Sequence, residues 1–176
     1  MDNSNVFFGW RVVFQFYTLK NLLIDSIVPM LLSTIVVILS YMSHVASYDV
    51  LNKGLNLGMT VAPVMISLLI AAYAILLSMF CSNTGKAIAQ QEGGTNLLDG
   101  LNADFATSIL ASFVGIIFFI MASFIHSLGF TCLYADFINY FALFIAAYLL
   151  FFSVYILKDL VIGIFNFGRV AAYFQD

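Results

Sequence analysis

Residues 59–81 read MTVAPVMISLLIAAYAILLSMFC, a run of 23 residues without one formally charged side chain. Three further runs share this property, at residues 26–45, 106–128 and 137–157. An α-helix rises 1.5 Å per residue, so about 20 residues cross the roughly 30 Å hydrocarbon core of a bilayer. A backbone in lipid must satisfy its own hydrogen bonds, and none of the runs alternates as a barrel strand would. The sequence therefore predicts four transmembrane helices.

The composition excludes an ordinary soluble domain. The chain has 176 residues, of which 63% are hydrophobic and 9% charged, and its mean hydropathy is +1.05. Soluble domains are roughly 45–50% apolar and about 25% charged. A secreted disulfide domain, a disordered tail and a protein that binds nucleic acid directly are therefore excluded, the last because phosphate contacts need a basic surface. We expect an all-α integral membrane protein, with residues 1–176 forming a single membrane domain in contact with the lipid bilayer.

The basic residues predict the orientation, since cytoplasmic segments carry an excess of Lys and Arg. A cytoplasmic N-terminus places five of the six basic residues on the inner side: Arg11, Lys20, Lys86, Lys158 and Arg169. Only Lys53 is then outside. Both termini and the loop at residues 82–105 would face the cytoplasm, and residues 46–58 and 129–136 the opposite side. We expect a multi-pass protein of the inner (plasma) membrane.

Residues 6–24 have the pattern of an amphipathic helix. Polar side chains at helical spacing form one stripe, namely Arg11, Gln15, Thr18 and Asn21. Such a helix can lie in the headgroup layer. Asp25 and Ser26 suit an N-cap and Pro29 suits a first turn, which favours a new helix starting there. The alternative is one long tilted helix that runs through Lys20 and Asp25.

Residues 158–174 form a second amphipathic flank. A single helix from Phe137 to Phe174 would be about 57 Å long, nearly twice the hydrocarbon core. The segment must therefore project into the cytoplasm or bend onto the membrane surface. Polar residues near helical spacing favour a surface helix, with Gly163 or Gly168 as its hinge.

The loop at residues 82–105 is the largest soluble segment predicted, and it is too small for a catalytic domain. We expect it to dock a soluble cytoplasmic protein through Lys86, Glu92, Asp99 and Asp104. Cys81 would lie at the inner face and Cys132 in an outer loop. A disulfide within one chain is then excluded by distance.

Two of the predicted spans carry stripes of small or weakly polar residues. The first comprises Ser67, Ala71, Ala74 and Ser78, and the second Ser108, Ser112, Gly115 and Ser123. Small residues let membrane helices approach closely, so the stripes indicate packing within one chain or between chains of a homo-oligomer. The alternative is that they line a water-filled pore.

The sequence predicts neither a catalytic site nor a cofactor or metal. His44 and His126 lie at outer helix ends and could sense pH there. No tight spacing of ligands supports a metal site. No Asp, Glu, Lys or Arg lies at mid-bilayer depth, where pumps, transporters and intramembrane enzymes keep such residues. We therefore expect a protein that is not an enzyme.

The chain has aromatic-rich flanks, including Phe7-Phe8-Gly9-Trp10-Arg11, and a tail that reads KDLVIG at residues 158–163. With four spans and both ends inside, this layout resembles the small four-helix membrane proteins of bacterial anti-phage defence, nearest the membrane subunit of the Kiwa system. The likeness covers the whole chain as a layout, without a residue motif. It implies an inner-membrane oligomer that senses phage attack and works with a soluble, DNA-binding partner in the cytoplasm.

Three functions are compatible with these patterns. The first is a non-enzymatic, oligomeric membrane scaffold or sensor that docks a cytoplasmic effector. The second is an oligomeric pore that permeabilises or depolarises the membrane. The third is a peripheral subunit of a larger respiratory or transport complex.

Overall fold

A computed structural model of the chain describes residues 19–82, 86–87, 90, 94–129 and 133–172. These residues form four long α-helices: α2 (Leu19–Met42), α3 (Ser47–Phe80), α5 (Gly94–Ser127) and α6 (Ala135–Ala172). Each helix contains a segment that is long and apolar enough to cross a membrane. The all-α class and the four membrane-spanning helices predicted from the sequence are confirmed, and they are typical of a multi-pass membrane protein.

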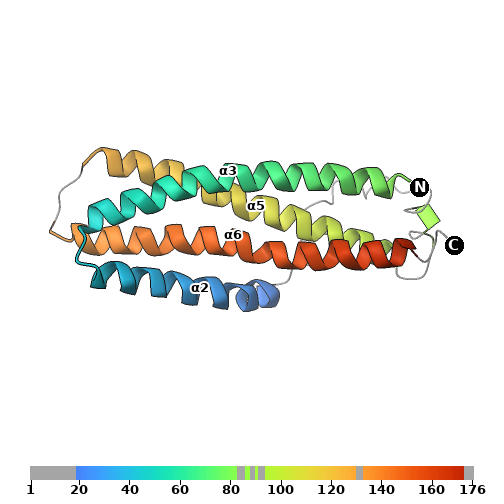
Figure 1. Ribbon diagram of the computed structural model, residues 1–176, viewed down its shortest axis with the longest axis horizontal. Helices are drawn as coiled ribbons and strands as arrows, with labels where there is room; N and C mark the ends of the chain where they lie inside the picture. Colours follow the sequence, from blue (N-terminus) through green and yellow to red (C-terminus); the bar gives the residue numbers. More distant parts are fainter. Residues whose placement is uncertain (1–18, 83–85, 88–89, 91–93, 130–132, 173–176) are drawn as a thin grey trace.

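The helices lie along one long axis (Figure 1). α6 contacts the other three, and α3, α5 and α6 contact one another, whereas α2 packs mainly on α6. We call the end that holds Met42, Ser47, Ser127 and Ala135 the Ser47 end, and the opposite end, with Phe80 and Gly94, the Phe80 end. α2 starts about half-way along α6 and runs to the Ser47 end, so it lies beside only one half of the bundle (Figure 1).

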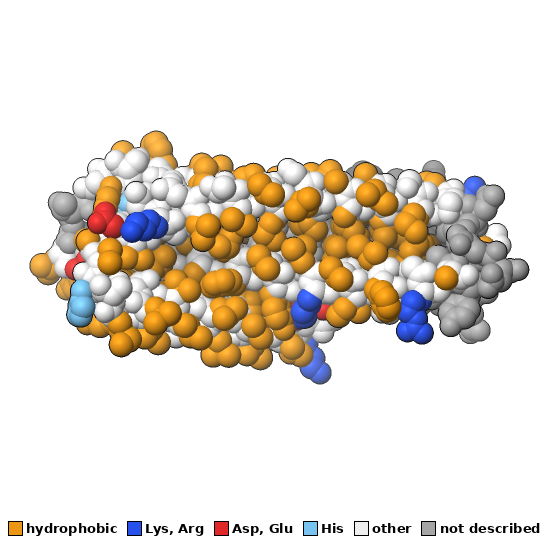
Figure 2. Space-filling model, viewed as in Figure 1, with side chains coloured by type: hydrophobic (Ala, Val, Ile, Leu, Met, Phe, Trp, Pro, Cys, Tyr) orange, Lys and Arg blue, Asp and Glu red, His pale blue; other side chains and the backbone are white. Residues whose placement is uncertain are grey.

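The interior is built from two apolar clusters, one in each half of the bundle. The cluster nearer the Ser47 end comprises Leu51, Leu55, Ala62, Phe119, Leu143 and Ala146. The cluster nearer the Phe80 end comprises Leu69, Leu76, Leu101, Phe105, Leu160 and Phe167. The outside is also apolar. Figure 2 shows hydrophobic side chains over most of the visible face, as expected for helices whose solvent is lipid.

Two helices begin earlier than their uncharged runs. Residues 46–58, which precede the uncharged run, are almost entirely helical, because α3 starts at Ser47 and buries Leu51 and Leu55 on the same face as Ala62. The predicted inner loop at residues 82–105 is wrong in its second part, because α5 starts at Gly94 and buries Leu101 and Phe105. In both helices the buried face continues on the N-terminal side of the charged residue that precedes the uncharged run. A charge marks where the apolar run stops, and the helix extends beyond it.

Both flanking segments also differ from the favoured predictions. The helix start at Asp25 is wrong, since α2 is continuous from Leu19 and carries Pro29 inside it. Residues 6–18 of the predicted interfacial helix lie outside the described residues. At the other end α6 runs unbroken through Gly163 and Gly168 to Ala172, without the predicted hinge. The reason is again a continuous buried face, here Ile156, Leu160 and Phe167.

Candidate functional site

Most of the described charged and histidine side chains gather at two levels, and the others, Lys86, Asp99 and Arg169, lie toward the Phe80 end. The Ser47-end belt comprises His44, Asp49, Lys53, His126 and Asp136. The mid-bundle belt comprises Lys20, Asp25, Asp104, Lys158 and Asp159. Along α5 and α6 the belts are 22 positions apart, at Asp104–His126 and Asp136–Lys158. This is about 33 Å at 1.5 Å per residue, close to the roughly 30 Å hydrocarbon core.

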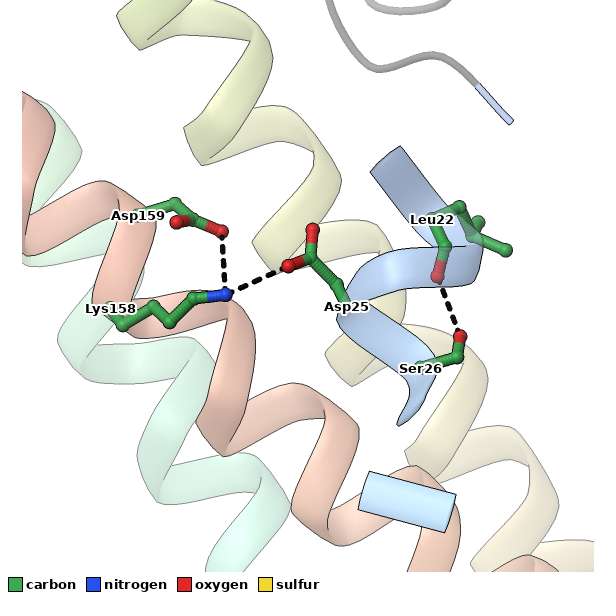
Figure 3. Close-up of polar contacts among 5 residues, drawn as sticks. All are labelled: Leu22, Asp25, Ser26, Lys158 and Asp159. Atoms are coloured by element: carbon green, nitrogen blue, oxygen red, sulfur yellow. Dashed lines mark hydrogen bonds and ion pairs between the residues drawn. The ribbon is translucent and has the colours of Figure 1, made fainter. Parts of the chain in front are cut away.

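Lys158 is the centre of the mid-bundle belt, and it joins α6 to α2 (Figure 3). Its ammonium lies 2.7 Å from Asp25 Oδ1 and 3.5 Å from Asp159 Oδ2, and 3.7 Å from the centre of the Tyr155 ring. The Asp25 side chain is only 12% exposed, and that of Lys158 is 37% exposed. Asp104 of α5 lies near enough to Asp25 and Asp159 to be repelled by both. Two carboxylates therefore share one ammonium, and a third carboxylate lies near them.

A second polar contact joins the same turn of α2 to α6. Ser26 Oγ donates a hydrogen bond of 2.7 Å to the carbonyl of Leu22 (Figure 3), and it lies 2.8 Å from Tyr148 Oη. The single hydroxyl hydrogen of Ser26 is used by Leu22, so Tyr148 is the donor in the second bond. Together with the Lys158–Asp25 pair, this contact fixes the position of α2 along the axis of α6.

Beyond the mid-bundle belt, three helices continue without α2. We call residues 73–80, 94–103 and 160–172 the projecting end; its α6 part is about 20 Å long. It has its own contacts: Phe80 packs edge-on against Phe167 with ring centres 5.3 Å apart, and Tyr73 Oη donates to Asn102 Oδ1 at 3.3 Å. Large apolar side chains on α3 and α6 are nevertheless exposed there: Ile75, Leu77, Met79, Val161, Ile162 and Phe165.

The residues predicted to dock a partner are not all together. Lys86 and Asp99 are exposed at the Phe80 end. Asp104 is half-buried and belongs to the mid-bundle belt instead. Glu92 lies outside the described residues. The docking surface itself stays a prediction.

The two small-residue stripes face in different directions. Ser108, Ser112 and Gly115 of α5 are buried, and Ser123 is half-buried. A Cβ on Gly115 would lie 3.9 Å from Leu149 Cβ and 4.0 Å from Ser153 Oγ of α6, so α5 and α6 meet there. The α3 stripe is exposed along its whole length, at Ser67, Ala71, Ala74 and Ser78. Its role between chains stays a prediction.

The predicted pH-sensing histidines share one end of the bundle. His44 is exposed just after α2, with a φ of 55°. His126 is half-buried, and its ring stacks on Tyr48 with centres 3.8 Å apart. Within the part of the chain that the structure describes, no three His, Cys, Asp or Glu side chains are grouped so that they could hold a metal. Cys81 is exposed, and Cys132 lies outside the described residues.

Sequence reasoning missed the pairing of Asp25 with Lys158. A signal was present, because both residues border an uncharged run at the same predicted membrane face, and their charges are opposite. The sequence alone does not show which helices are neighbours, and so it does not show that α2 packs on α6.

No protein-family model matches the chain, and neither a curated protein nor a solved structure matches it.

Proposed function

We propose that the protein is a non-enzymatic, oligomeric scaffold or sensor of the inner (plasma) membrane that docks a soluble cytoplasmic effector. The observation that carries this proposal is the projecting end. It has an apolar core of its own, and it exposes apolar side chains of α3 and α6 beyond the mid-bundle belt. Contiguous apolar surface outside lipid is typical of a protein interface.

The bilayer lies between the two charge belts in this proposal. The separation of about 33 Å fits a hydrocarbon core and leaves the projecting end in the aqueous phase or the headgroup layer. In this position residues 73–80, the last part of the span predicted at 59–81, lie beyond the hydrocarbon core, and the membrane-spanning part of α3 is shifted toward Ser47. Lys86 and Arg169 are on that side, with Lys20 and Lys158 at its boundary. The excess of basic residues makes this side the cytoplasm. Both ends of the chain are then inside.

A role in anti-phage defence is part of the proposal, and the likeness in layout is what supports it. A sensor of this kind needs a face toward the outside and a docking surface inside. The Ser47 end and the projecting end supply these two surfaces on the same helices.

The docking hypothesis predicts that a soluble protein co-purifies with the full chain from its native membrane. The triple change Lys86→Ala, Glu92→Ala and Asp99→Ala should weaken the purified partner's binding about tenfold or more, which corresponds to about 1.4 kcal/mol. Titration of the partner onto reconstituted protein measures this effect. Lys53→Ala, an exposed change at the opposite end, is the matched control and should leave binding unchanged. Equal binding by the triple variant and the control would contradict a docking site at residues 86–99.

A membrane pore is the second candidate function, and the exposed α3 stripe favours it. Ser67 and Ser78 donate hydrogen bonds to carbonyls of their own helix, at 2.9 and 2.7 Å, and their oxygen lone pairs remain available to water. If copies of the chain associate through this stripe, Ala71→Leu should reduce the mass of the native complex in detergent, while Leu23→Ala on the exposed face of α2 should not. The same oligomer in liposomes should pass ions if it is a pore. A wild-type oligomer that conducts under no trigger would leave only the scaffold.

A further inference from the structure

A cavity of about 720 Å³ lies at the Ser47 end, between α3, α5 and α6. Its walls are mainly apolar, with Leu51, Phe118, Met121, Ile125 and Phe141 among the lining residues. Met121 and Phe141 keep more than half of their surface exposed, so the cavity opens onto the apolar outside of the bundle. Ligand sites in proteins have this size and this mixture of apolar walls with a few polar groups.

One carboxylate dominates the polar part of the cavity. Asp136 is an exposed residue, and it carries the only formal charge among the lining residues. Ser47 Oγ donates to its Oδ1 atom at 2.5 Å, and Asn139 Nδ2 donates to Ser47 Oγ at 3.1 Å. Ser47 is 7% exposed, so this chain of hydrogen bonds holds the carboxylate against α3. A carboxylate can accept about four hydrogen bonds, and the described residues supply one, from Ser47.

His126 lies on another wall of the cavity. The ring is held in place by stacking on Tyr48, with ring centres 3.8 Å apart. Its Nε2 atom is buried and has no hydrogen-bond partner among the described residues. Because this atom is closed off from the cavity, His126 lines the wall through its other atoms, and Asp136 is the group that a polar ligand would meet.

We propose that the cavity binds the primary ammonium group of an amphipathic molecule, with the apolar chain against α5 and α6. The ammonium donates to the free oxygen of Asp136, and its positive charge matches the one formal charge of the cavity. A phosphate head without an amine would be repelled by Asp136. The site lies in the Ser47-end belt, where the headgroups lie if the bilayer position proposed above is right. A lipid such as phosphatidylethanolamine and a free alkylamine both supply this chemistry.

Native mass spectrometry of the full chain, purified in detergent, tests the site. Phosphatidylethanolamine should bind at least tenfold more tightly than phosphatidylcholine with the same acyl chains, because the trimethylated headgroup has no N–H donor. Asp136→Asn keeps the shape and the acceptor for Ser47, and should remove this preference. Asp49→Asn, an exposed carboxylate at the same end, should keep it.

Dodecylamine is the second probe, and it separates the two sources of the ammonium. Binding of phosphatidylethanolamine and dodecylamine, both lost in Asp136→Asn, assigns the site to the shared ammonium. Binding of dodecylamine alone assigns it to free amines. Equal binding of phosphatidylethanolamine and phosphatidylcholine without dodecylamine binding, or an Asp136→Asn variant that retains all binding, would overturn the proposal. Neither outcome bears on partner docking at the Phe80 end, which is measured separately.

Discussion

Gly58→Ala is expected to lower the midpoint of thermal unfolding in detergent by about 4–8 °C, although alanine is the better helix former. A Cβ at Gly58 would lie 2.4 Å from Cε1 of Phe119, and 2.6 Å from both Cδ1 and Cζ. Phe119 is 1% exposed and packs with Leu55 and Leu143. The ring has no free space to move into, and overpacking of this kind costs about 1–3 kcal/mol. A net loss of about 2 kcal/mol corresponds to the stated shift for a chain of this length.

Gly168→Ala is the matched control. It makes the same chemical change in another helix, and a Cβ there would meet nothing within 4 Å. Alanine should raise helix stability at that position by up to about 1 kcal/mol, so the midpoint should stay the same or rise. Phe119→Leu should partly rescue Gly58→Ala, because it makes room at the contact. If both glycine variants shifted the midpoint equally, the close approach of α3 to Phe119 would be refuted.

Lys158→Met is expected to destabilise the protein by about 1–3 kcal/mol and to loosen α2. Lys158 is the only cation in contact with Asp25 among the described residues, and Asp104 and Asp159 are near. Its loss leaves three carboxylates to repel one another. Breaking a fully buried pair costs roughly 3–5 kcal/mol, but Lys158 is 37% exposed and solvent reduces this figure.

A double-mutant cycle by thermal unfolding measures the pair. Asp25→Asn together with Lys158→Met should be less unstable than Lys158→Met alone, because the second change removes one of the carboxylates that repel one another near the lost ammonium. Lys158→Arg should be close to the wild type. Lys20→Met, an exposed cation at the same level, should have little effect. A Lys158→Met variant as stable as Lys20→Met would mean that the pair does not hold α2.

The sequence predicts the spans well because lipid excludes charge, and the four uncharged runs are unmistakable. It predicts the helix ends poorly for a related reason. Leu51 and Leu101 continue buried stripes past Lys53 and Asp104, where packing between helices takes over from lipid as the factor that favours burial. A helix therefore ends where its buried face ends, and that face depends on neighbours in the fold.

Whether a stripe of small residues faces the interior or the outside of the bundle is likewise set by tertiary structure. The small residues of α3 and α5 have nearly the same composition and spacing, yet Ser112 is buried against neighbouring helices while Ala71 is exposed. The sequence contains only part of the information needed to predict the cavity at the Ser47 end. His126 and Asp136 were recognisable as titratable groups of one face, but Ser47, Tyr48 and Asn139 become part of the site only when three helices meet.

The packing of α2 on α6 has a consequence for how the chain is made. Asp25 and its partner Lys158 are separated by 133 positions, so the ribosome produces α2 well before α6, the helix that receives it. At about 5–20 residues per second, the delay is on the order of ten seconds. During that time α3 and α5 can already pair, since they contact each other directly. The docking of α2 therefore waits until α6 has been synthesised.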